Sequence, residues 1–431
     1  MNKNSLASLL ILFTYTFYSC SEKPLYFENA YVIENINVID PLEGLSEEMT
    51  LVIKKNKISH LFKSKKIKLS SENTIYNGTD QFLIPGLWDA HVHFAFETIL
   101  AEAMSNLFLS YGVTSVRDTG GPIDFVLPYK THSLKHPKTT PKIMIAGPLV
   151  DGKYNVYDGS SVSYPLLSIQ NASITVLEEQ VQGLIDKKVD FLKAYEMLSP
   201  EQFKRLAQMA QENDLKLTGH VPLSLDVITA SNLGLNSMEH LRNIELSMSK
   251  DFDVLLTDRT LALKNSNNLS GSKLRTSLHQ SQRMRAVASI DHERREEVLN
   301  TLAKNQTWQI PTMVLYQTFA NKKYLNEEFQ NHFKVLPENV RSKWMKKINV
   351  TSSDLDPEIL KYTDWSQKMV LQMHEKKIPF MAGTDTPIGY LVPGLSLHDE
   401  LIQLKRSGFS NLQTLKAATF NPALYFGMED T

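Results

Sequence analysis

The stretch 82-FLIPGLWDAHVHF-94 decides the fold. It is an apolar run, opened by Pro85-Gly86 and closed by His91 and His93, and it is typical of a buried strand. On a strand, residues two apart point to the same face, so the two histidines aim at one point. A His-x-His pair alone occurs often by chance, so its meaning depends on where the other candidate ligands fall.

Four later segments have the pattern of short strands that end in one residue able to bind a metal. They cover 189–193, 215–220, 236–240 and 378–385, and they end in Lys193, His220, His240 and Asp385. In a barrel of eight parallel strands, the active site lies at the C-terminal ends of the strands. Six such side chains at five strand ends therefore predict a metal centre.

Strand and helix patterns alternate from residue 85 onward. We expect helices at 98–111, 175–188, 200–213 and 223–232, and further strands at 113–118, 142–147 and 307–315. This order predicts an α/β protein, a (β/α)8 TIM barrel of right-handed βα units. Two long polar insertions, at about 245–300 and 319–361, follow strands at the catalytic face, and we expect helical caps there that control substrate size.

Residues 26–84 have the pattern of short strands rather than of helices. The candidate strands are 30–40, 49–62 and 73–84, and Asn56-Lys57 and Asn77-Gly78 provide turn residues between them. The segment is predicted to be a small β domain in front of the barrel of residues 85–431.

Taken together, the motifs resemble those of the amidohydrolase superfamily, in the branch of imidazolonepropionase-like proteins and Xaa-Pro dipeptidases. The resemblance is carried by IPGLWDAHVH, GVTSVRDTGG (112–121), DFLKAYE (190–196), TGHVP (218–222), SMEHL (237–241) and AGTDTP (382–387). It implies that residues 26–84 form part of a small β-sandwich beside the barrel. Strands that normally follow the position of Ala423 are missing, so we expect a C-terminally truncated appendage with exposed strand edges and a possible homo-oligomer.

The resemblance also implies how the ligands divide. His91, His93 and Asp385 would hold a first metal, and His220 and His240 a second, which gives two zinc ions in all. Lys193 would bridge both ions as a carboxylated (carbamylated) lysine, because an ammonium group has no lone pair to offer. The alternative for Lys193 is a lysine in a buried salt bridge.

Asp385 has a second role in the family, as the catalytic general base that becomes the general acid. It would take a proton from a metal-activated hydroxide and pass that proton to the leaving nitrogen; the alternative is a helix-capping aspartate. Tyr195 shares the strand face of Lys193 and is a candidate for substrate binding. Glu239 is expected to point away from His240, and Arg117 and Asp118 to form a structural ion pair. The remaining histidines, His279 and His398 among them, are expected to be structural.

Residues 1–20 resemble a bacterial lipoprotein signal peptide. Lys3 precedes an apolar run too short to span a bilayer, and the run ends at Cys20, the only cysteine in the chain. We expect lipidation at Cys20 and a location in the bacterial cell envelope, either periplasm or outer membrane. The formal net charge of −1 gives no reason to expect a nucleic-acid partner.

These observations favour a metal-dependent amidohydrolase that cleaves C–N bonds of a dipeptide or a cyclic amide. Two alternatives stay open. One is a one-metal, deaminase-like member of the superfamily that does not need Lys193. The other is a non-catalytic envelope lipoprotein derived from such an enzyme.

Overall fold

The structure is a computed structural model that describes residues 26–63, 68–69, 72–265 and 269–430. The chain divides into two compact units between Ile84 and Pro85, and each unit is described by itself. The predicted signal peptide and Cys20 lie outside the described residues.

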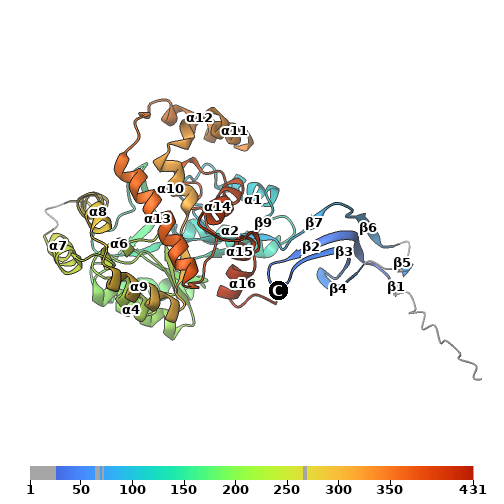
Figure 1. Ribbon diagram of the computed structural model, residues 1–431, viewed down its shortest axis with the longest axis horizontal. Helices are drawn as coiled ribbons and strands as arrows, with labels where there is room; N and C mark the ends of the chain where they lie inside the picture. Colours follow the sequence, from blue (N-terminus) through green and yellow to red (C-terminus); the bar gives the residue numbers. More distant parts are fainter. Residues whose placement is uncertain (1–25, 64–67, 70–71, 266–268, 431) are drawn as a thin grey trace, which may run out of the picture. The chain divides into compact units, whose positions relative to one another are not determined.

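The first unit is a small sheet in which β2 is the central strand (Figure 1). Strand β3 pairs antiparallel with β2 and with β4, whereas β6 and β7 pair with β2 in parallel. Val32 and Val52 pack with Phe27 and Ala30 in a core of its own. The strands are β1 (Tyr26–Phe27), β2 (Tyr31–Asp40), β3 (Gly44–Lys54), β4 (Lys57–Lys63), β5 (Lys68–Leu69), β6 (Thr74–Asn77) and β7 (Phe82–Leu83).

Two of the strands predicted in this unit are each split by a turn. The segment 49–62 divides at Lys55 and Asn56, which both have positive φ, into β3 and β4. The segment 73–84 divides after Asn77 into β6 and β7. Both breaks fall at turn-forming residues, because an asparagine tolerates the left-handed conformation that a tight turn requires.

The second unit contains two parallel sheets that carry the candidate site. One sheet has the order β10-β9-β8 and the other the order β14-β11-β15-β16-β17-β18. Their strands are β8 (Leu87–Val92), β9 (Val113–Asp118), β10 (Lys142–Ile145), β11 (Leu149–Asp151), β14 (Ser168–Gln170), β15 (Phe191–Ala194), β16 (Lys216–Gly219), β17 (Ser237–Glu239) and β18 (Trp308–Ile310). A small antiparallel hairpin, β12 (Asp158–Ser161) and β13 (Tyr164–Leu166), lies between β11 and β14 in the sequence.

Backbone hydrogen bonds connect the two sheets at both ends. The amide of Asp190, just before β15, donates to the carbonyl of Ile145 on β10. On the other side, Met381 donates to Gln309 on β18, and Ala90 on β8 donates to Ala382. The segment 379–386 therefore lies between β18 and β8.

The last two predicted strands are less regular in the structure than in the prediction. Strand β18 ends at Ile310, because Pro311 has no amide proton and Thr312 has a positive φ. In 378–385 only Phe380 forms a β-bridge, to Gln309. The prediction of a full strand was wrong for both segments, although their backbones follow the expected course.

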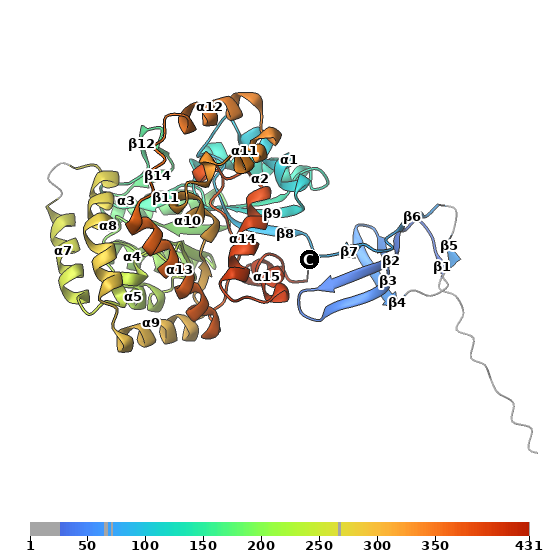
Figure 2. The ribbon, with the colours of Figure 1, turned by 45° about the horizontal axis from the view of Figure 1, so that its top comes forward.

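Helices cover the outside of these parallel strands (Figures 1 and 2). Helix α4 begins as predicted, with Ser199 in a capping box with Gln202 and with Pro200 at the first helical position. The helices that follow individual strands are α1 (Ala101–Ser110), α2 (Ile123–Lys135), α3 (Ile174–Asp186), α4 (Pro200–Glu212) and α5 (Val227–Asn232). The described chain ends in three successive helices, α14 (Leu395–Arg406), α15 (Asn411–Ala417) and α16 (Phe420–Tyr425).

Both predicted insertions contain helices. After β17 come α6 (Ile244–Ser247), α7 (Phe252–Lys264), α8 (Gly271–Ala288) and α9 (His292–Lys304). After β18 come α10 (Met313–Ala320), α11 (Glu327–Asn331), α12 (Glu338–Ile348) and α13 (Pro357–Glu375), with 3-10 turns η1 (Lys323–Leu325) and η2 (His332–Val335) among them. A third such turn, η3 (Ile388–Tyr390), follows Asp385.

One continuous apolar core joins the strands to these helices. Val113 of β9 and Leu192 of β15 belong to the same buried cluster as Phe108 of α1, Val181 of α3 and Leu206 of α4. Each fully buried side chain of this kind contributes about 1.5–3 kcal/mol. The core therefore fixes the strand ends from which the candidate ligands project. Among the described residues, no helix is both long enough and apolar enough to span a membrane.

Candidate metal centre

The candidate ligands line a single cavity at the C-terminal ends of the parallel strands. All six predicted ligands contribute to its wall, together with Tyr195. The cavity has a volume of about 30 Å³, room for only one or two water-sized groups. The ligands are at least nineteen-twentieths buried: His91, His93, Lys193, His220, His240 and Asp385.

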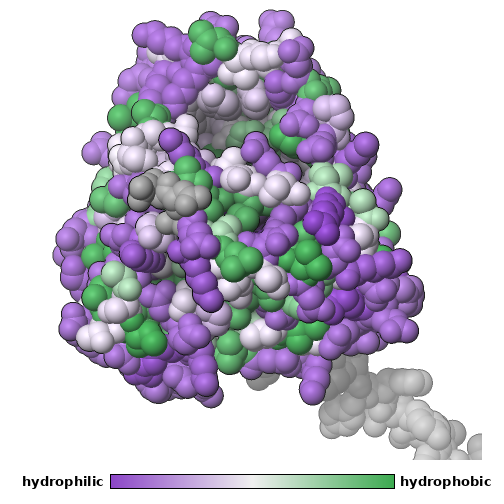
Figure 3. Space-filling view, turned by 90° about the vertical axis from the view of Figure 1, so that its left-hand side faces the viewer, coloured by the Kyte–Doolittle hydropathy of each residue, from purple (hydrophilic) through white to green (hydrophobic). Residues whose placement is uncertain are grey.

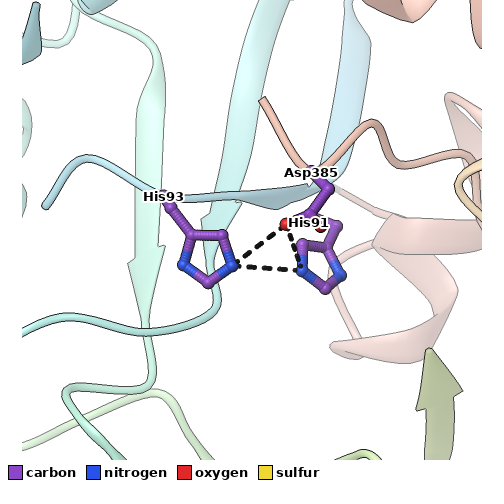
Figure 4. A group of neighbouring side chains, drawn as sticks. All are labelled: His91, His93 and Asp385. Carbon is purple, nitrogen blue, oxygen red and sulfur yellow. Dashed lines mark hydrogen bonds and ion pairs between the residues drawn. The ribbon is translucent and has the colours of Figure 1, made fainter. Parts of the chain in front are cut away.

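Three of these side chains converge closely (Figure 4). Oδ1 of Asp385 lies 3.1 Å from Nε2 of His91 and 3.1 Å from Nε2 of His93. The two Nε2 atoms are 3.3 Å apart. His91 lies on β8, His93 directly follows it, and Asp385 comes from the neighbouring segment 379–386, so adjacent backbone segments bring the three atoms together.

The spacing of these atoms fits a common divalent ion. Ligands about 2.0–2.1 Å from a tetrahedral zinc ion are roughly 3.4 Å apart. The buried Oδ1 of Asp385 also has no aligned hydrogen-bond partner among the described residues. Three buried nitrogen and oxygen atoms this close together are what a metal site requires, so these residues fit a divalent ion.

The histidines are held in place through their other ring nitrogen. Nδ1 of His93 lies 3.0 Å from the carbonyl of Gly120, and Nδ1 of His240 lies 2.6 Å from Oγ1 of Thr312. Nδ1 of His220 lies 2.7 Å from a carboxylate oxygen of Glu196. When Nδ1 donates its proton in this way, Nε2 keeps a lone pair that can bind a metal.

Burial keeps most of these histidines neutral. It lowers the pKa of His220 to about 3, despite the nearby carboxylate of Glu196. It also lowers the pKa of His91 and of His240 well below the usual value. His93 differs, because the hydrogen bond and the charge of Asp385 outweigh burial and raise its pKa.

Asp385 is the carboxylate that joins the two groups of histidines. Its Oδ2 lies 3.7 Å from Nε2 of His240, while Oδ1 faces His91 and His93. Burial alone would raise the pKa of Asp385, but the electrostatic interactions and hydrogen bonds with the surrounding histidines, His91 foremost, outweigh it and hold that pKa well below its usual range. Asp385 is therefore an ionised carboxylate, which can bind a metal or accept a proton.

Glu239 belongs to the site, and the expectation that it points away was wrong. It directly contacts Nζ of Lys193, and one of its oxygens lies 3.6 Å from Nδ1 of His91. Arg117, Thr218 and Ser237 surround it inside the strands, and Arg117 pairs with it at 2.8 Å. The prediction assumed that side chains alternate along the strand. Strand β17 ends at Glu239, however, and His240 has a φ of 55°, so the alternation stops between them.

Lys193 is in a setting that favours an uncharged amine. Burial, with the charge of Arg117, lowers its pKa well below the usual value. An amine without its extra proton has a free lone pair, which is the form that can react with carbon dioxide. His91, Glu239 and His240 also offer a second group of close ligand atoms beside this lysine.

Glu196 is a site residue that the sequence analysis missed. It is fully buried and lies between His220 and two side chains of helix α8, Arg275 and His279. The prediction that His279 is purely structural was therefore incomplete. No local pattern marks these residues, because Glu196 and His279 are more than eighty positions apart.

The remaining wall of the cavity carries aromatic hydroxyls and positive charge. Tyr157, Tyr195 and Arg242 line the cavity, and Arg275 donates a hydrogen bond of 3.1 Å to the hydroxyl of Tyr195. The rings of Tyr195 and His220 lie against each other, with centroids 4.5 Å apart. Tyr195 is therefore beside the candidate ligands, as predicted.

Other predicted residues lie around the site rather than in it. Arg117 forms its ion pair with Glu239, whereas Asp118 accepts hydrogen bonds from the amides of Phe94 and Gly120. Asp118 thereby orders the turn that follows His93. His398 contacts the carbonyl of Tyr111 at the surface and does not line the cavity.

Comparisons with known proteins identify the family. Residues 82–431 match the amidohydrolase family, and the chain belongs to that family. It is accordingly a hydrolase that acts on carbon–nitrogen bonds, and the family implies a divalent metal and a fold of the (β/α)8 type.

Solved structures resemble the chain over most of its length. A crystal structure of an Xaa-Pro dipeptidase with methionine bound in its active site has a TM-score of 0.65, at 16% identity, over 93% of this chain and 90% of that one. A putative prolidase from Bifidobacterium longum has a TM-score of 0.62, at 18% identity, over 93% of this chain and 84% of that one. In sequence, 85 residues are 32% identical to an adenine deaminase of Clostridium perfringens, a match that spans 20% of this chain and 15% of the deaminase.

Proposed function

We propose that this protein is a metal-dependent dipeptidase that cleaves an amide bond in a small substrate with a free carboxylate. The convergence of His91, His93 and Asp385 within 3.1–3.3 Å carries the proposal. The dipeptidase and prolidase among the similar structures support a dipeptide over a cyclic amide. We further propose that seven parallel strands and the segment 379–386 form a closed eight-stranded barrel. The seven strands are β8, β9, β10, β15, β16, β17 and β18.

The residues that would hold the metal fall into two groups. His91, His93 and Asp385 would hold one zinc ion, and His220 and His240 a second, with carboxylated Lys193 bridging them. The low pKa of the buried histidines supports this assignment, because only a neutral imidazole can bind a metal. A bound ion of this kind supplies a hydroxide nucleophile at neutral pH and polarises the amide carbonyl.

Asp385 would carry the proton through the reaction. As an ionised carboxylate it accepts the proton of the attacking water while the new C–O bond forms. It then donates that proton to the amide nitrogen as the C–N bond breaks, which lets the amine leave.

The charge of the cavity wall supports a substrate carboxylate. Arg242 and Arg275 both approach Glu196. Arg242 also lies in the cavity wall, together with Tyr157 and Tyr195. A substrate carboxylate would accept hydrogen bonds from the guanidinium group of Arg242 and from the hydroxyls of these tyrosines.

A paired substrate screen tests the proposal. The purified protein is loaded with zinc, its metal content is measured, and it is offered a dipeptide library and the same dipeptides with amidated C-termini. We expect two zinc ions per chain and at least about tenfold faster cleavage of the free acids, since hydrogen bonds to charged groups are worth about 1.5–3 kcal/mol. Less than one ion per chain, or no hydrolysis of any dipeptide, would contradict the proposal.

A one-metal deaminase is the second candidate, favoured by the short match to an adenine deaminase. Such an enzyme would not need Lys193. Release of ammonia from adenine by the wild-type protein, with full activity retained in Lys193→Ala, would support it over the dipeptidase.

A separate proposal concerns where in the cell the protein is located. We propose that a lipid at Cys20 anchors the protein in a bacterial envelope. Fractionation of cells that make the wild-type protein or Cys20→Ser tests it, with the wild-type chain expected in the membrane fraction and the variant outside it.

A further inference from the structure

Helix α8 contacts the candidate metal centre through one buried carboxylate. The helix lies in the insertion between β17 and β18, beside α7 (Figure 2). Its residues include four basic side chains and no acidic one. Figure 3 looks onto the side of the unit that carries α7 and α8, where hydrophilic residues predominate and the surface is hollowed in its upper half.

Glu196 divides its two oxygens between the metal centre and this helix. Oε1 accepts the Nδ1 proton of His220 at 2.7 Å. Oε2 lies 3.1 Å from Nε2 of His279, a residue of α8. Arg275, one turn earlier on α8, lies 3.6 Å from Oε1. One carboxylate therefore contacts both a candidate ligand and the insertion.

Arg283 determines which ring nitrogen of His279 carries the proton. Its guanidinium can only donate, and it donates to Nδ1 of His279 at 3.1 Å. The proton of the neutral His279 is thus on Nε2, where it faces Glu196. Burial and the charge of Arg283 lower the pKa of His279 well below its usual value, which agrees with a neutral ring. Arg283 is itself fixed over the ring of Tyr362, at 4.4 Å.

The cavity behind this contact is small. Its volume of about 30 Å³ is far below that of the substrate class proposed above. A substrate of that class would therefore extend beyond this volume, along the wall of the cavity. Helix α8 holds that wall, because Arg275 binds the hydroxyl of Tyr195 and lies over the rings of Tyr157 and Tyr164.

We propose that Glu196 is a positioning residue that couples closure of α8 to the geometry of His220. When α8 is closed, His279 and Arg275 hold Glu196, and Glu196 holds the ring of His220 with Nε2 toward the cavity. When α8 moves away, Glu196 loses two partners and His220 is less firmly placed. Metal binding and closure of α8 therefore favour each other, as linkage requires. The inference rests on the proposed function, in that His220 must bind the metal.

The test measures metal binding and helix protection rather than turnover. Zinc affinity is measured by competition with a chelator, and hydrogen–deuterium exchange of the amides of α8 is followed with and without zinc. In the full-length wild-type protein, we expect zinc to slow exchange in α8. Glu196→Gln, which places an amide against the donor of His279, should weaken zinc binding about 10–100-fold and abolish the protection.

His279→Ala and His279→Gln provide the sharper comparison, since His279 does not line the cavity of the candidate ligands. The alanine variant should weaken zinc binding several-fold and lose the protection of α8. The glutamine variant keeps an N–H donor and should recover part of both. Gln280→Ala, an exposed neighbour on the same helix, is the matched control and should behave like the wild type.

Three outcomes are distinguishable. If zinc binds with unchanged affinity in both His279 variants and protects α8 equally in all proteins, the coupling is absent, whatever becomes of the dipeptidase proposal. If no zinc binds to the wild type, the proposed function and the coupling both fail. If Glu196→Gln does not fold, as judged by circular dichroism, the His279 series decides the question alone.

Discussion

The two groups of candidate ligands are held in different ways. His91, His93 and Asp385 lie on adjacent backbone segments, and their three facing atoms are within 3.3 Å of one another. His220 and His240 depend on side chains outside the strands, Glu196 and Thr312, for the orientation of their rings. The first group is thus built by the strands, and the second by loops and by an insertion. This difference suggests that the first group is the more rigid and that the second can respond to the substrate.

The largest effect is expected from replacing Asp385, the residue that contacts both groups of candidate ligands. Asp385→Asn keeps the size of the side chain but removes its charge and its ability to accept a proton. We expect kcat/KM for a cleaved dipeptide to fall about 10³- to 10⁴-fold, in line with the loss of a general base. Asp124→Asn, at an exposed position, is the control. A loss of less than tenfold would exclude Asp385 as the base.

Lys193→Ala tests the second group. Without the bridging group, we expect one zinc ion per chain in place of two and a loss of activity of more than about 100-fold. Metal analysis and steady-state kinetics measure the two effects, with Lys187→Ala as an exposed control. Two ions and full activity in the alanine variant would contradict the bridging role.

Tyr195→Phe tests the part of the cavity wall that is proposed to bind the substrate. The variant loses only a hydroxyl that hydrogen bonds to Arg275, in the part of the wall next to His220. We expect KM to rise about tenfold with kcat within a few-fold, because a hydrogen bond to a charged group is worth about 1.5–3 kcal/mol. Tyr129→Phe, on α2 and outside the cavity wall, should change neither value. A change in kcat alone would indicate a role in the chemical step.

The smallest expected difference between the two groups is in the pH dependence of zinc affinity, because protons compete with the metal for the ligand nitrogens. The pKa of His93 is raised by Asp385, whereas burial lowers that of His220 to about 3. A metal must displace any proton on its ligand, so affinity falls with pH only below the pKa of that ligand. In His220→Asn, which keeps the first group, we expect zinc affinity to fall by up to about tenfold per pH unit between pH 7 and 5.

In His93→Asn, which keeps the second group, the same titration should be nearly flat. Chelator competition across this range measures both variants. If zinc affinity falls more steeply with pH in His93→Asn than in His220→Asn, the raised pKa has been assigned to the wrong group of ligands.

The sequence predicts the first group better than the second. The His-x-His pair lies on one strand, where a period of two determines direction, and its partner Asp385 ends the last apolar segment. The strands themselves are recognisable because buried parallel strands are continuous apolar runs. Local patterns are enough for these features.

The residues that the sequence analysis missed or misplaced depend on contacts between distant parts of the chain, which local sequence patterns do not encode. Glu196, His279 and Arg283 meet only in the folded chain, so no spacing rule could find them. Glu239 was misplaced because the left-handed backbone at His240 ends the strand one residue early. The segment 378–385 lacks regular strand structure because Pro379 interrupts it and Asp385 has a φ of 67°.

Two glycines limit how this site can be redesigned. A methyl group at Gly383 would come within 2.8 Å of Cβ of His91 and 2.6 Å of Cγ2 of Ile310. At Gly219, which has a φ of 153°, it would come within 2.2 Å of the carbonyl oxygen of Ala194. A mutant library aimed at new substrates should therefore leave these two positions unchanged. Within the insertions it should also spare Arg275 and His279, which contact Glu196 beside His220.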